Sequence, residues 1–478
     1  MFLMGCDEVE GEDYVECTST VQRLTGFNVC CAIVANHPQC VFEHSDMTGA
    51  FLHEKNPKKI LARLPEGLRT YKHVNGKRIE EYYWVDNLYG RHDAGRVFVK
   101  AHRKYFLDRG FVATTAEPCV FVKRVGDEFV IASMYVDDVA WIASNETTMA
   151  VERKAYKTQY IAQFAPCTGF LGTAVERDAG EGVVRTHQKH QIDKIVSKWL
   201  PEESKLRSRP ADRPCDEKLV SLVSPAARAT YEECDPQLKT AYQSLLGELL
   251  YVCLARRGDA LYAVIMLGRC ASNPTEELFM RLLMVVSYLH GSREQAIEYR
   301  QSAGLVLTAF SDASFETWGA TTGLVIFLAG AAVSAMARRQ RCVTLSTCEA
   351  ELVALSMCAA EVIYFRILLE ELGFEQTRPT EINVDNTAAR QVAMEPVLSS
   401  EMKHVRRRHY FARQMQEVGE IVVNWVDTKF NWADALTKAL PAAKHREMTS
   451  QFTRLHNASE RARPDAVAAL AMIGENRT

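Results

Sequence analysis

Two adjacent aspartates, Asp137 and Asp138, interrupt an apolar stretch of the sequence, "FVIASMYVDDVAWIAS" (129–144). A short polar break between two apolar runs of strand length predicts a β-hairpin with both acids at its tip. A bare Asp-Asp pair is by itself more typical of an ordinary polar turn, because aspartate is common in turns. The apolar flanks nevertheless favour burial, so we expect the hairpin to be held in a core.

The composition excludes several classes of protein. The chain has 478 residues, 47% hydrophobic and 24% charged, which is typical of a globular chain with two or three domains. On the sequence alone, no apolar run is long enough to span a bilayer, and "MFLMGCDEVE" does not have the pattern of a signal peptide. The 14 cysteines form no C-x-x-C pair, which favours reduced thiols. We therefore expect an intracellular protein, cytoplasmic or nuclear, that is neither secreted nor bound to a membrane.

The residue pattern changes at two points along the chain. Residues 201–240 contain five prolines, which is a linker composition, and residues 240–300 have helical periodicity that breaks at Asn273-Pro274 into two helices. From 304 the pattern predicts three strands, then a long helix (346–373), a strand (380–386), a helix (403–419), a strand (420–428) and a final helix (432–440). This order predicts an α/β unit. The tail, 441–478, has no motif.

A third acid, Asp46, lies in "EHSDMTGAFLHEKN" (43–56). Asp46, Asp137 and Asp138 together could bind two Mg²⁺ ions, because hard divalent cations prefer carboxylate oxygens. Two such ions flank the phosphoryl centre in polymerases, where one activates the attacking hydroxyl and the other stabilises the leaving pyrophosphate. The three acids therefore predict a two-metal site, with Mn²⁺ as an alternative ion.

A series of motifs accompanies these acids in a fixed order: "DYVECTSTVQRLTG", "SDMTGAFLH", "LPEGL", "NLYGRHDAGRVF", "EPCVFVKR", "MYVDDVAWIAS", "GFLGTAVERD", "YQSLLGELLYVCLARRGDALYAV" and "ASNPTEELFMRLLMVVSYLHGS". By these motifs, residues 13–300 resemble the reverse transcriptase region of copia-type LTR retrotransposon Pol polyproteins. The resemblance implies a right hand of fingers, palm and thumb that uses an RNA template and dNTPs. It also implies that Asp46, Asp137 and Asp138 are catalytic metal ligands, and that Phe51 contacts the nucleotide and excludes a ribose 2′-hydroxyl. A core phenylalanine is the alternative interpretation of Phe51.

Four more acids fall at predicted strand ends and helix starts: Asp312, Glu351, Asp385 and Asp434. An α/β sheet gathers its site at such positions. Four carboxylates would repel one another unless cations bridge them, which again predicts two Mg²⁺ ions, here activating a water for phosphodiester hydrolysis.

Residues 304–440 resemble the copia-type ribonuclease H domain through "FSDASFETWGATTGLVIFLAGAAVSAMARRQRCVTLSTCEAELVALS", "INVDNTAA", "MKHVRRRHYFARQ" and "NWADALTKAL". The resemblance implies that the four acids are catalytic metal ligands and that an RNA–DNA hybrid is the substrate. It favours Glu351 over Glu349, because related ribonucleases H place the acid before a large apolar residue. The two glutamates lie about 200° apart on a helix, so we expect Glu349 to be solvated.

The segment "KHVRRRHYFAR" (403–413) concentrates positive charge in a chain whose net charge is −3. It is either a solvated helix face or a contact for hybrid phosphates that makes binding salt-dependent. On the second interpretation, the nucleic-acid-binding residues are Lys403, Arg406, Arg407 and Arg408.

The sequence departs from the family pattern in its first half. An acidic stretch replaces the basic segment that family members carry ahead of "GEDYVECTSTVQRLTG", and His92, Asp93 and Gly95 replace Lys, Gln and Pro. Thr48 and Gly49 replace Lys and Thr. Fewer cations near the incoming triphosphate, and an acid at Asp93 near the template or nucleotide phosphates, predict an impaired polymerase. The alternative is a non-catalytic retrotransposon relic that binds nucleic acid.

Taken together, the sequence predicts the α/β class, as an α+β polymerase right hand with truncated fingers followed by an α/β ribonuclease H-like domain. The predicted domains are fingers and palm (1–200), linker with helical thumb or connection (201–303), ribonuclease H-like domain (304–440) and tail (441–478).

Overall fold

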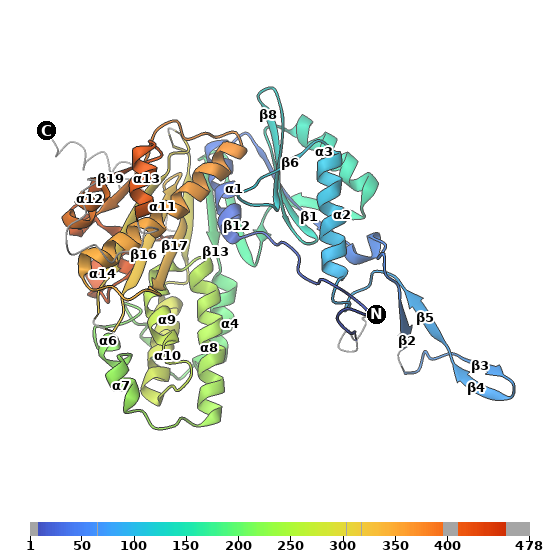
Figure 1. Cartoon of the computed structure of the whole chain (residues 1–478), viewed down its shortest axis with the longest axis horizontal. Coiled ribbons are helices and arrows are strands. Elements are labelled where there is room, and N and C mark those ends of the chain that lie inside the picture. Colours follow the sequence, from blue (N-terminus) through green and yellow to red (C-terminus); the bar gives the residue numbers. More distant parts are fainter. Residues whose placement is uncertain (1–7, 65, 303, 317, 395–409, 456–478) are drawn as a thin grey trace. The chain divides into compact units, whose positions relative to one another are not determined.

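The chain folds into two units that each combine helices with sheets (Figure 1). The computed structural model describes residues 8–64, 66–302, 304–316, 318–394 and 410–455. The first unit consists of Met1–Phe27 and Gln39–Phe170, and the second of Asn28–Pro38 and Leu171–Thr478. The predicted α/β class is confirmed by this mixture of helices and strands. The four predicted functional domains stay predictions.

The first unit is built on a six-stranded antiparallel sheet with the strand order β10-β1-β9-β8-β7-β6. Its strands are β1 (Val41–Met47), β6 (Val112–Ala113), β7 (Val120–Val125), β8 (Glu128–Tyr135), β9 (Asp138–Ala143) and β10 (Ala162–Pro166). The predicted hairpin is therefore present as β8–β9. It lies inside the sheet, with a neighbouring strand on either side.

Two helices, α2 (Ala94–Asp108) and α3 (Glu146–Gln159), contribute to the core of this unit. Their aromatic residues pack against the buried Trp141 of β9, whose ring centroid lies 5.5 Å from that of Phe106 and 5.2 Å from that of Tyr156. Aromatic side chains bury large apolar areas and dominate the energetics of such cores. The hairpin strands are consequently anchored by α2 and α3.

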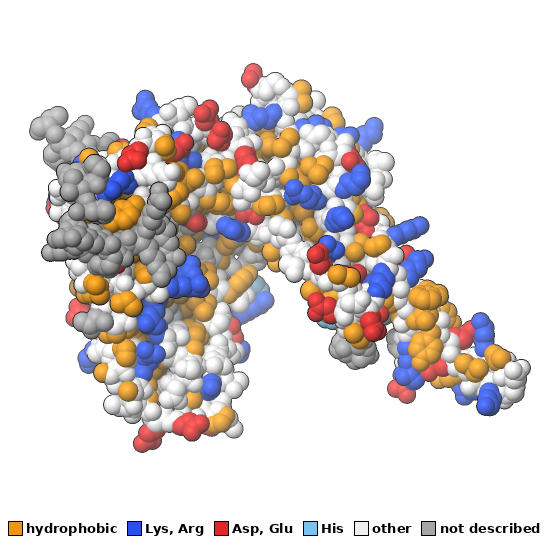
Figure 2. All heavy atoms as spheres, viewed as in Figure 1, with side chains coloured by type: hydrophobic (Ala, Val, Ile, Leu, Met, Phe, Trp, Pro, Cys, Tyr) orange, Lys and Arg blue, Asp and Glu red, His pale blue; other side chains and the backbone are white. Residues whose placement is uncertain are grey.

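A slender arm extends from this unit (Figure 1). It contains two two-stranded ribbons, one of β2 (Ile60–Arg63) with β5 (Tyr82–Val85) and one of β3 (Tyr71–Val74) with β4 (Lys77–Glu80). Leu61 lies opposite Trp84 in the first ribbon, and both side chains are exposed. Hydrophobic side chains are visible on the arm in Figure 2. A two-stranded ribbon has no second layer to cover its faces.

The second unit begins with an antiparallel sheet and a helical core. The sheet contains β12 (Thr173–Asp178), β13 (Val183–His187), β14 (Gln295–Arg300) and β20 (Arg454–Leu455), and β11 (Gly169–Phe170) precedes it in the chain. The helices are α1 (Leu24–Asn36, whose residues from Asn28 belong to this unit), α4 (Lys189–Trp199), α8 (Pro236–Ala255), α9 (Leu261–Gly268) and α10 (Glu276–Gly291). The predicted break at Asn273-Pro274 separates α9 from α10.

Two expectations for residues 201–300 need correction. The helical region contains a further break, because α8 ends at Ala255 and the 3-10 turn η3 (Gly258–Ala260) precedes α9. Buried charges in this break, the ion pair of Arg257 with Asp259, have no periodic signature in the sequence. The proline-rich stretch also carries short helices, α5 (Lys205–Ser208), α6 (Lys218–Leu222) and α7 (Pro225–Ala229). Proline is tolerated in the first turn of a helix, as in α7.

A five-stranded mixed sheet forms the rest of the second unit, in the order β17-β16-β15-β18-β19. Its strands are β15 (Thr308–Ser314), β16 (Thr321–Leu328), β17 (Ala331–Arg339), β18 (Thr380–Val384) and β19 (Ile421–Trp425). The first three are antiparallel, whereas β18 and β19 run parallel to β15. This order matches the predicted succession of strands, with one helix that the sequence did not indicate, α12 (Thr387–Met394).

The long predicted helix is present as α11 (Thr347–Glu371). The Ser346 hydroxyl accepts a hydrogen bond from the Glu349 backbone N–H at its start, and Gly373 follows its end with a φ of 83°, a left-handed conformation that favours glycine. By length and composition α11 could span a membrane, which corrects the expectation that no such segment exists. Its side chains are mostly buried, as expected of a core helix packed on β15 and β16.

The C-terminal expectations hold only in part. The segment predicted as a final helix, 432–440, forms the 3-10 turn η7 (Trp432–Leu436), and the helix α14 (Ala442–Thr449) follows Pro441. A smaller turn, η6 (Thr428–Phe430), precedes η7. Of the predicted helix 403–419, the described part is α13 (Phe411–Glu417). Part of the tail is therefore structured, since α14 and β20 lie within it, and residues 456–478 lie outside the described part.

Candidate metal sites

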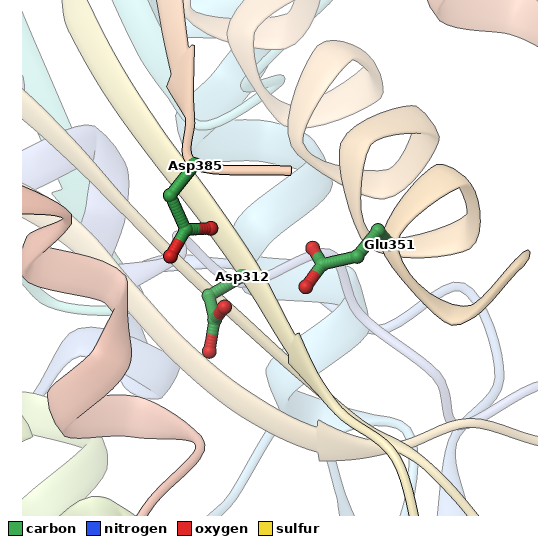
Figure 3. A group of neighbouring side chains, drawn as sticks. All are labelled: Asp312, Glu351 and Asp385. Carbon is green, nitrogen blue, oxygen red and sulfur yellow. The ribbon is translucent and has the colours of Figure 1, made fainter. Parts of the chain in front are cut away.

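Three acids of the mixed sheet converge on one point. Asp312 lies on the central strand β15, Asp385 directly follows the neighbouring parallel strand β18, and Glu351 comes from the start of α11. Each offers a carboxylate oxygen, and these oxygens lie within 4.8 Å of one another. Figure 3 shows the three carboxylates pointing toward a common centre. Asp312 and Glu351 are buried, with 1% and 7% of their surface exposed, and Asp385 is half-buried.

The fold itself brings these residues together. Because β15 and β18 are parallel neighbours, Asp312 and Asp385 lie toward the same edge of the sheet. Asn431, which is fully buried, links them further: its side-chain amide donates to the Ser311 carbonyl at 3.1 Å and to Asp385 Oδ1 at 3.2 Å. The carboxylate of Asp385 is thus oriented by a hydrogen bond from a fully buried side chain.

Asp434, the fourth predicted acid, lies in η7 on the other side of Asp312. Lys438 connects the two acids, because its Nζ lies 2.7 Å from Asp434 Oδ1 and 3.4 Å from Asp312 Oδ2. The Thr437 hydroxyl also donates to Asp312 Oδ2. The approach of η7 to the sheet requires Gly323, which pairs with Asp312 across β15 and β16. A Cβ at residue 323 would lie 2.6 Å from Thr437 Cγ2, closer than atoms can pack.

Burial and crowding change the acidity of this cluster. Burial, with the charges of Asp312 and Asp385, raises the pKa of Glu351 to about 9. Burial and Asp312 likewise raise the pKa of Asp434 to about 7, against the opposing effect of Lys438. Burial alone would lower the pKa of Lys438, but Asp312 and Asp434 raise it overall. The lysine is therefore held in its charged form by the acids that it joins.

The structure distinguishes the two candidate glutamates of α11. Glu351 joins Asp312 and Asp385, as the sequence favoured. Glu349 points elsewhere, and the expectation that it is solvated is wrong: it is only 5% exposed and its carboxylate accepts a hydrogen bond from the Leu345 backbone N–H at 2.7 Å. Its role is to cap the start of the helix, a function typical of glutamate at this position.

The acids of the hairpin occupy a different setting. Asp46 on β1 lies directly opposite Asp138 on β9, which places their side chains on one face of the sheet. The two-residue turn consists of Val136 and Asp137, so Asp138 belongs to strand β9. The expectation that both acids lie at the tip of the hairpin is therefore correct for Asp137 and wrong for Asp138. Val136 has a φ of 56°, which is costly for a β-branched residue and is found where surrounding structure imposes it.

Side chains on either side of the hairpin hold it in place. The buried His102 of α2 lies between the Val136 carbonyl (Nδ1 to O, 3.2 Å) and the Tyr156 hydroxyl (Nε2 to Oη, 2.9 Å). Burial lowers the pKa of His102 to about 4, so the ring is neutral and donates to the strained turn through Nδ1. On the acidic face, His44 Nε2 lies 3.2 Å from Asp138 Oδ1. Burial, followed by Asp138 and Asp46, raises the pKa of Asp137.

Of the other predicted binding residues, Phe51 lies in η2 (Ala50–His53) close to the sheet of the hairpin. Its ring is half-buried and packs on Tyr89 at 4.6 Å between ring centroids, and on Phe98 at 5.9 Å. The packing role and the nucleotide role are both compatible with this position. The predicted basic residues, Lys403, Arg406, Arg407 and Arg408, lie outside the described residues.

The altered 91–95 stretch is internally paired. Arg91, whose side chain is fully buried, contacts Asp93 (Nε to Oδ1, 3.0 Å) and donates to the Lys58 carbonyl at 2.8 Å. Asn56 donates to the other oxygen of Asp93 at 3.0 Å. The negative charge that we expected to oppose a triphosphate is thus compensated within the fold. Gly49, another departure, has a φ of 68°, which glycine adopts without strain.

Both sites offer oxygen donors, which suit hard cations such as Mg²⁺ or Mn²⁺. Within the described ranges, only Asp312, Glu351 and Asp385 satisfy the geometry of a ready metal site. The hairpin acids share a face without converging as closely.

Several residues that shape these sites were not predicted from the sequence. Asn431 carried the signal of a cap residue, since its side chain accepts a hydrogen bond from the Ala433 backbone N–H. Lys438 carried the signal of a cation four residues after Asp434. His102 and Gly323 carried no local signal, because their partners, Val136 and Thr437, are distant in the chain.

Comparison with known proteins defines the class. Residues 1–205 match the family "Reverse transcriptase (RNA-dependent DNA polymerase)". The chain is 25% identical over 463 residues to the retrovirus-related Pol polyprotein from transposon TNT 1-94 of Nicotiana tabacum, covering 96% of this chain and 34% of that protein. It is 26% identical over 459 residues to the Pol polyprotein from transposon RE1 of Arabidopsis thaliana, covering 94% and 30%.

Among solved structures, a foamy viral protease-reverse transcriptase in complex with double-stranded DNA aligns at 14% identity and a TM-score of 0.47, covering 86% of this chain and 60% of that chain. The chain spans about a third of the length of the curated relatives that it matches. It contains a reverse transcriptase region. More particularly, the similarity to the Pol polyproteins of transposons TNT 1-94, RE1 and RE2 extends over most of this chain and supports the resemblance to the C-terminal part of a copia-type LTR retrotransposon Pol polyprotein.

Proposed function

We propose that the chain is an RNA-directed DNA polymerase joined to an RNA–DNA hybrid ribonuclease. The family match over residues 1–205 supports the polymerase, which would take an RNA template and dNTPs. The convergence of the Asp312, Glu351 and Asp385 carboxylates within 4.8 Å carries the ribonuclease proposal. A cluster of buried acids at the edge of a mixed sheet suits metal-assisted phosphodiester hydrolysis.

We infer that divalent cations, Mg²⁺ or Mn²⁺, serve both sites. When bound, such ions supply Lewis-acid stabilisation of the phosphoryl group and a nucleophile of lowered pKa. Asp312, Glu351 and Asp385 would hold the ions of the buried site, together with Asp434. Asn431 orients Asp385 and Thr437 orients Asp312, so the donor oxygens are fixed before a substrate arrives.

For the polymerase we assign Asp46, Asp137 and Asp138 as the metal-binding acids. The opposed positions of Asp46 and Asp138 on paired strands support this assignment, and the hydrogen bond of His102 to the turn would keep Asp137 in place. Phe51 would exclude a ribose 2′-hydroxyl, and Phe51→Ala should then raise ribonucleotide incorporation. Unchanged sugar selectivity in that variant would leave Phe51 with its packing role alone.

The ribonuclease half is tested with an end-labelled RNA–DNA hybrid and Mg²⁺. We expect wild-type cleavage and loss of at least about 100-fold in Asp385→Asn, which removes a ligand charge while preserving size. Asp427→Asn serves as the matched control, because this exposed acid lies after β19 and caps η6 instead. Equal cleavage by the wild type and Asp385→Asn would refute the assignment.

The polymerase half is tested separately by extension of oligo(dT) on poly(rA). Incorporation above the level of Asp137→Asn supports the proposal. Salt-sensitive hybrid binding with no turnover at either site would instead favour the alternative, a non-catalytic relic that binds nucleic acid. In that assay Lys403, Arg406, Arg407 and Arg408 are the proposed phosphate contacts, and their replacement should reduce the salt dependence. The intracellular location stays a prediction.

A further inference from the structure

Lys438 divides the buried acid cluster into two unequal halves. On one side, Glu351 and Asp385 face Asp312 with their oxygens within 4.8 Å of one another. On the other side, the ammonium group of Lys438 lies between Asp312 and Asp434, 3.4 Å and 2.7 Å from their nearest oxygens. Asp312 belongs to both halves. The same carboxylate thus completes an open three-acid group and a lysine-filled two-acid group.

The lysine is held there by the fold. It lies four residues after Asp434, the spacing at which side chains meet across a helical turn. Thr437, fully buried, fixes the adjoining oxygen of Asp312. Gly323 allows η7 to approach the sheet closely enough for this contact. Lys438 itself is partly exposed, with 40% of its side-chain surface accessible, whereas the two carboxylates that it joins are almost fully buried.

The geometry points to Lys438 as a built-in counter-ion that occupies the position of a second divalent cation and must be displaced before that cation binds. This inference rests on the proposed function of the site. It gives metal binding an order: the first ion enters among Asp312, Glu351 and Asp385, and the second enters between Asp312 and Asp434 as Lys438 swings out. The two ions therefore differ in affinity because of the lysine, and not only because they repel each other.

Electrostatics explains why the fold places a lysine there. Asp312 and Asp434 are 1% and 3% exposed, and two adjacent buried carboxylates are unfavourable without a compensating charge. A lysine supplies one positive charge, so that no ion has to be bound from solution. Its side chain is flexible and its partners are oxygens, so the contact can be exchanged for a divalent ion. The cluster is thereby stable before metal is bound and still open to it.

The experiment is a calorimetric titration of Mn²⁺ into the full chain in an Asp137→Asn, Asp138→Asn background, so that heat reports on the buried cluster. We expect two steps in this parent and a second step tightened by at least about tenfold in Lys438→Met, because an opposing cation is removed. Lys438→Arg keeps the charge and should keep the weak second step. Lys444→Met is the matched control, because the Lys444 ammonium donates to the Lys429 carbonyl instead. Its second Mn²⁺ binding step should equal that of the parent.

The outcomes separate the inference from the proposed function. Hybrid cleavage by the wild type, with an unchanged or weakened second step in Lys438→Met, would overturn the inference alone. The absence of Mn²⁺ binding, together with no cleavage, would overturn both. If Lys438→Met is too unstable without metal to be titrated, Lys438→Gln is used with the Mn²⁺-induced rise in melting temperature as the readout. That rise should exceed the rise in the Lys444→Met control, and an equal rise contradicts the displacement.

Discussion

The two acidic sites differ in how deeply the fold buries their charges. In the mixed sheet, Asp312 and Asp434 are almost fully buried and are compensated by Lys438. At the hairpin, Asp46 is exposed and the side chain of Asp138 is 41% accessible, with His44 beside it. A buried carboxylate costs free energy unless it is paired, whereas an exposed one is stabilised by water. One site therefore stores electrostatic repulsion, while the other depends on the apolar and aromatic residues beneath it.

The largest expected consequence of this difference is a pH-dependent stability that metal reverses. The pKa values of Glu351 and Asp434 are raised to about 9 and about 7 in the folded chain, so the folded state binds more protons than the unfolded state between pH 5 and these values. Stability without metal should fall as pH rises through this window, by about 1.4 kcal/mol per pH unit for each titrating group. Urea unfolding at pH 5, 7 and 9 measures it.

Added Mg²⁺ should abolish most of that fall, because cations favour the charged carboxylates. Hydrogen exchange localises the effect: the first turns of α11 and η7 should lose protection at high pH, and the hairpin strands should not. A metal-free chain whose α11 start is equally protected at pH 5 and pH 9 would contradict the assignment of stored repulsion to this site.

The second prediction concerns the support beneath the hairpin. His102→Phe should destabilise the first unit by about 2–3 kcal/mol, because the Val136 carbonyl and the Tyr156 hydroxyl lose their buried partner. Primer extension should fall more than hybrid cleavage. Tyr105→Phe is a close control, because the buried Tyr105 hydroxyl has no hydrogen-bond partner within the described structure. If His102→Phe reduced hybrid cleavage more than primer extension, the supporting role of His102 at the hairpin would be contradicted.

The same histidine gives the hairpin a pH response of opposite sign. Its pKa is lowered to about 4 in the folded chain, so the unfolded state binds more protons between pH 4 and 6.5. Its contribution to stability is present above pH 6.5 and is lost as pH falls toward 4. His102→Phe should remove this acid sensitivity, which hydrogen exchange along β8 and β9 would detect.

A third prediction concerns the approach of η7 to the sheet. Gly323→Ala would place a Cβ 2.6 Å from Thr437 Cγ2 and 3.0 Å from the Ala433 carbonyl oxygen, and such overpacking costs about 1–3 kcal/mol. The shift should separate Asp434 from Asp312 and reduce hybrid cleavage, while primer extension is unchanged. Gly247→Ala in α8 is the control, because an added Cβ there would meet no atom within 4 Å and the residue does not have a left-handed φ. Full cleavage by Gly323→Ala would show that η7 tolerates displacement.

The sequence predicted the elements but not all of the contacts that make the sites. Periodicity located α11, and alternating strands located the mixed sheet, because both signals are local. The choice of Glu351 over Glu349 followed from resemblance, whereas the burial of Glu349 depends on its contact with Leu345. The prediction of a helix at the end of the α/β unit was wrong. The segment "WADALTKAL" has helical composition but is held as a 3-10 turn against β15 and β16. Packing overrode local propensity there.

The departures at 91–95 illustrate the same limit in the first unit. A lone aspartate in a motif that favours glutamine suggested a harmful charge. Its partners, Arg91 and Asn56, include one residue 37 positions away. The sequence shows that Asp93 departs from the motif, but it does not show that Asn56 lies next to it. The polymerase half therefore loses one reason to be considered impaired.

The smallest predicted effect is the loss of the His44 side chain beside the hairpin. His44→Gln removes a partner of Asp138 in a contact whose side chains are 24% and 41% accessible, and even an ion pair this exposed contributes only about 0–1 kcal/mol. The corresponding variant of the buried site, Lys438→Met, should cost several times more in the absence of metal, because it leaves buried carboxylates uncompensated. Urea unfolding of the two variants at pH 7, each with and without Mg²⁺, compares the sites directly. A His44→Gln cost equal to that of Lys438→Met would mean that burial does not separate the two sites energetically.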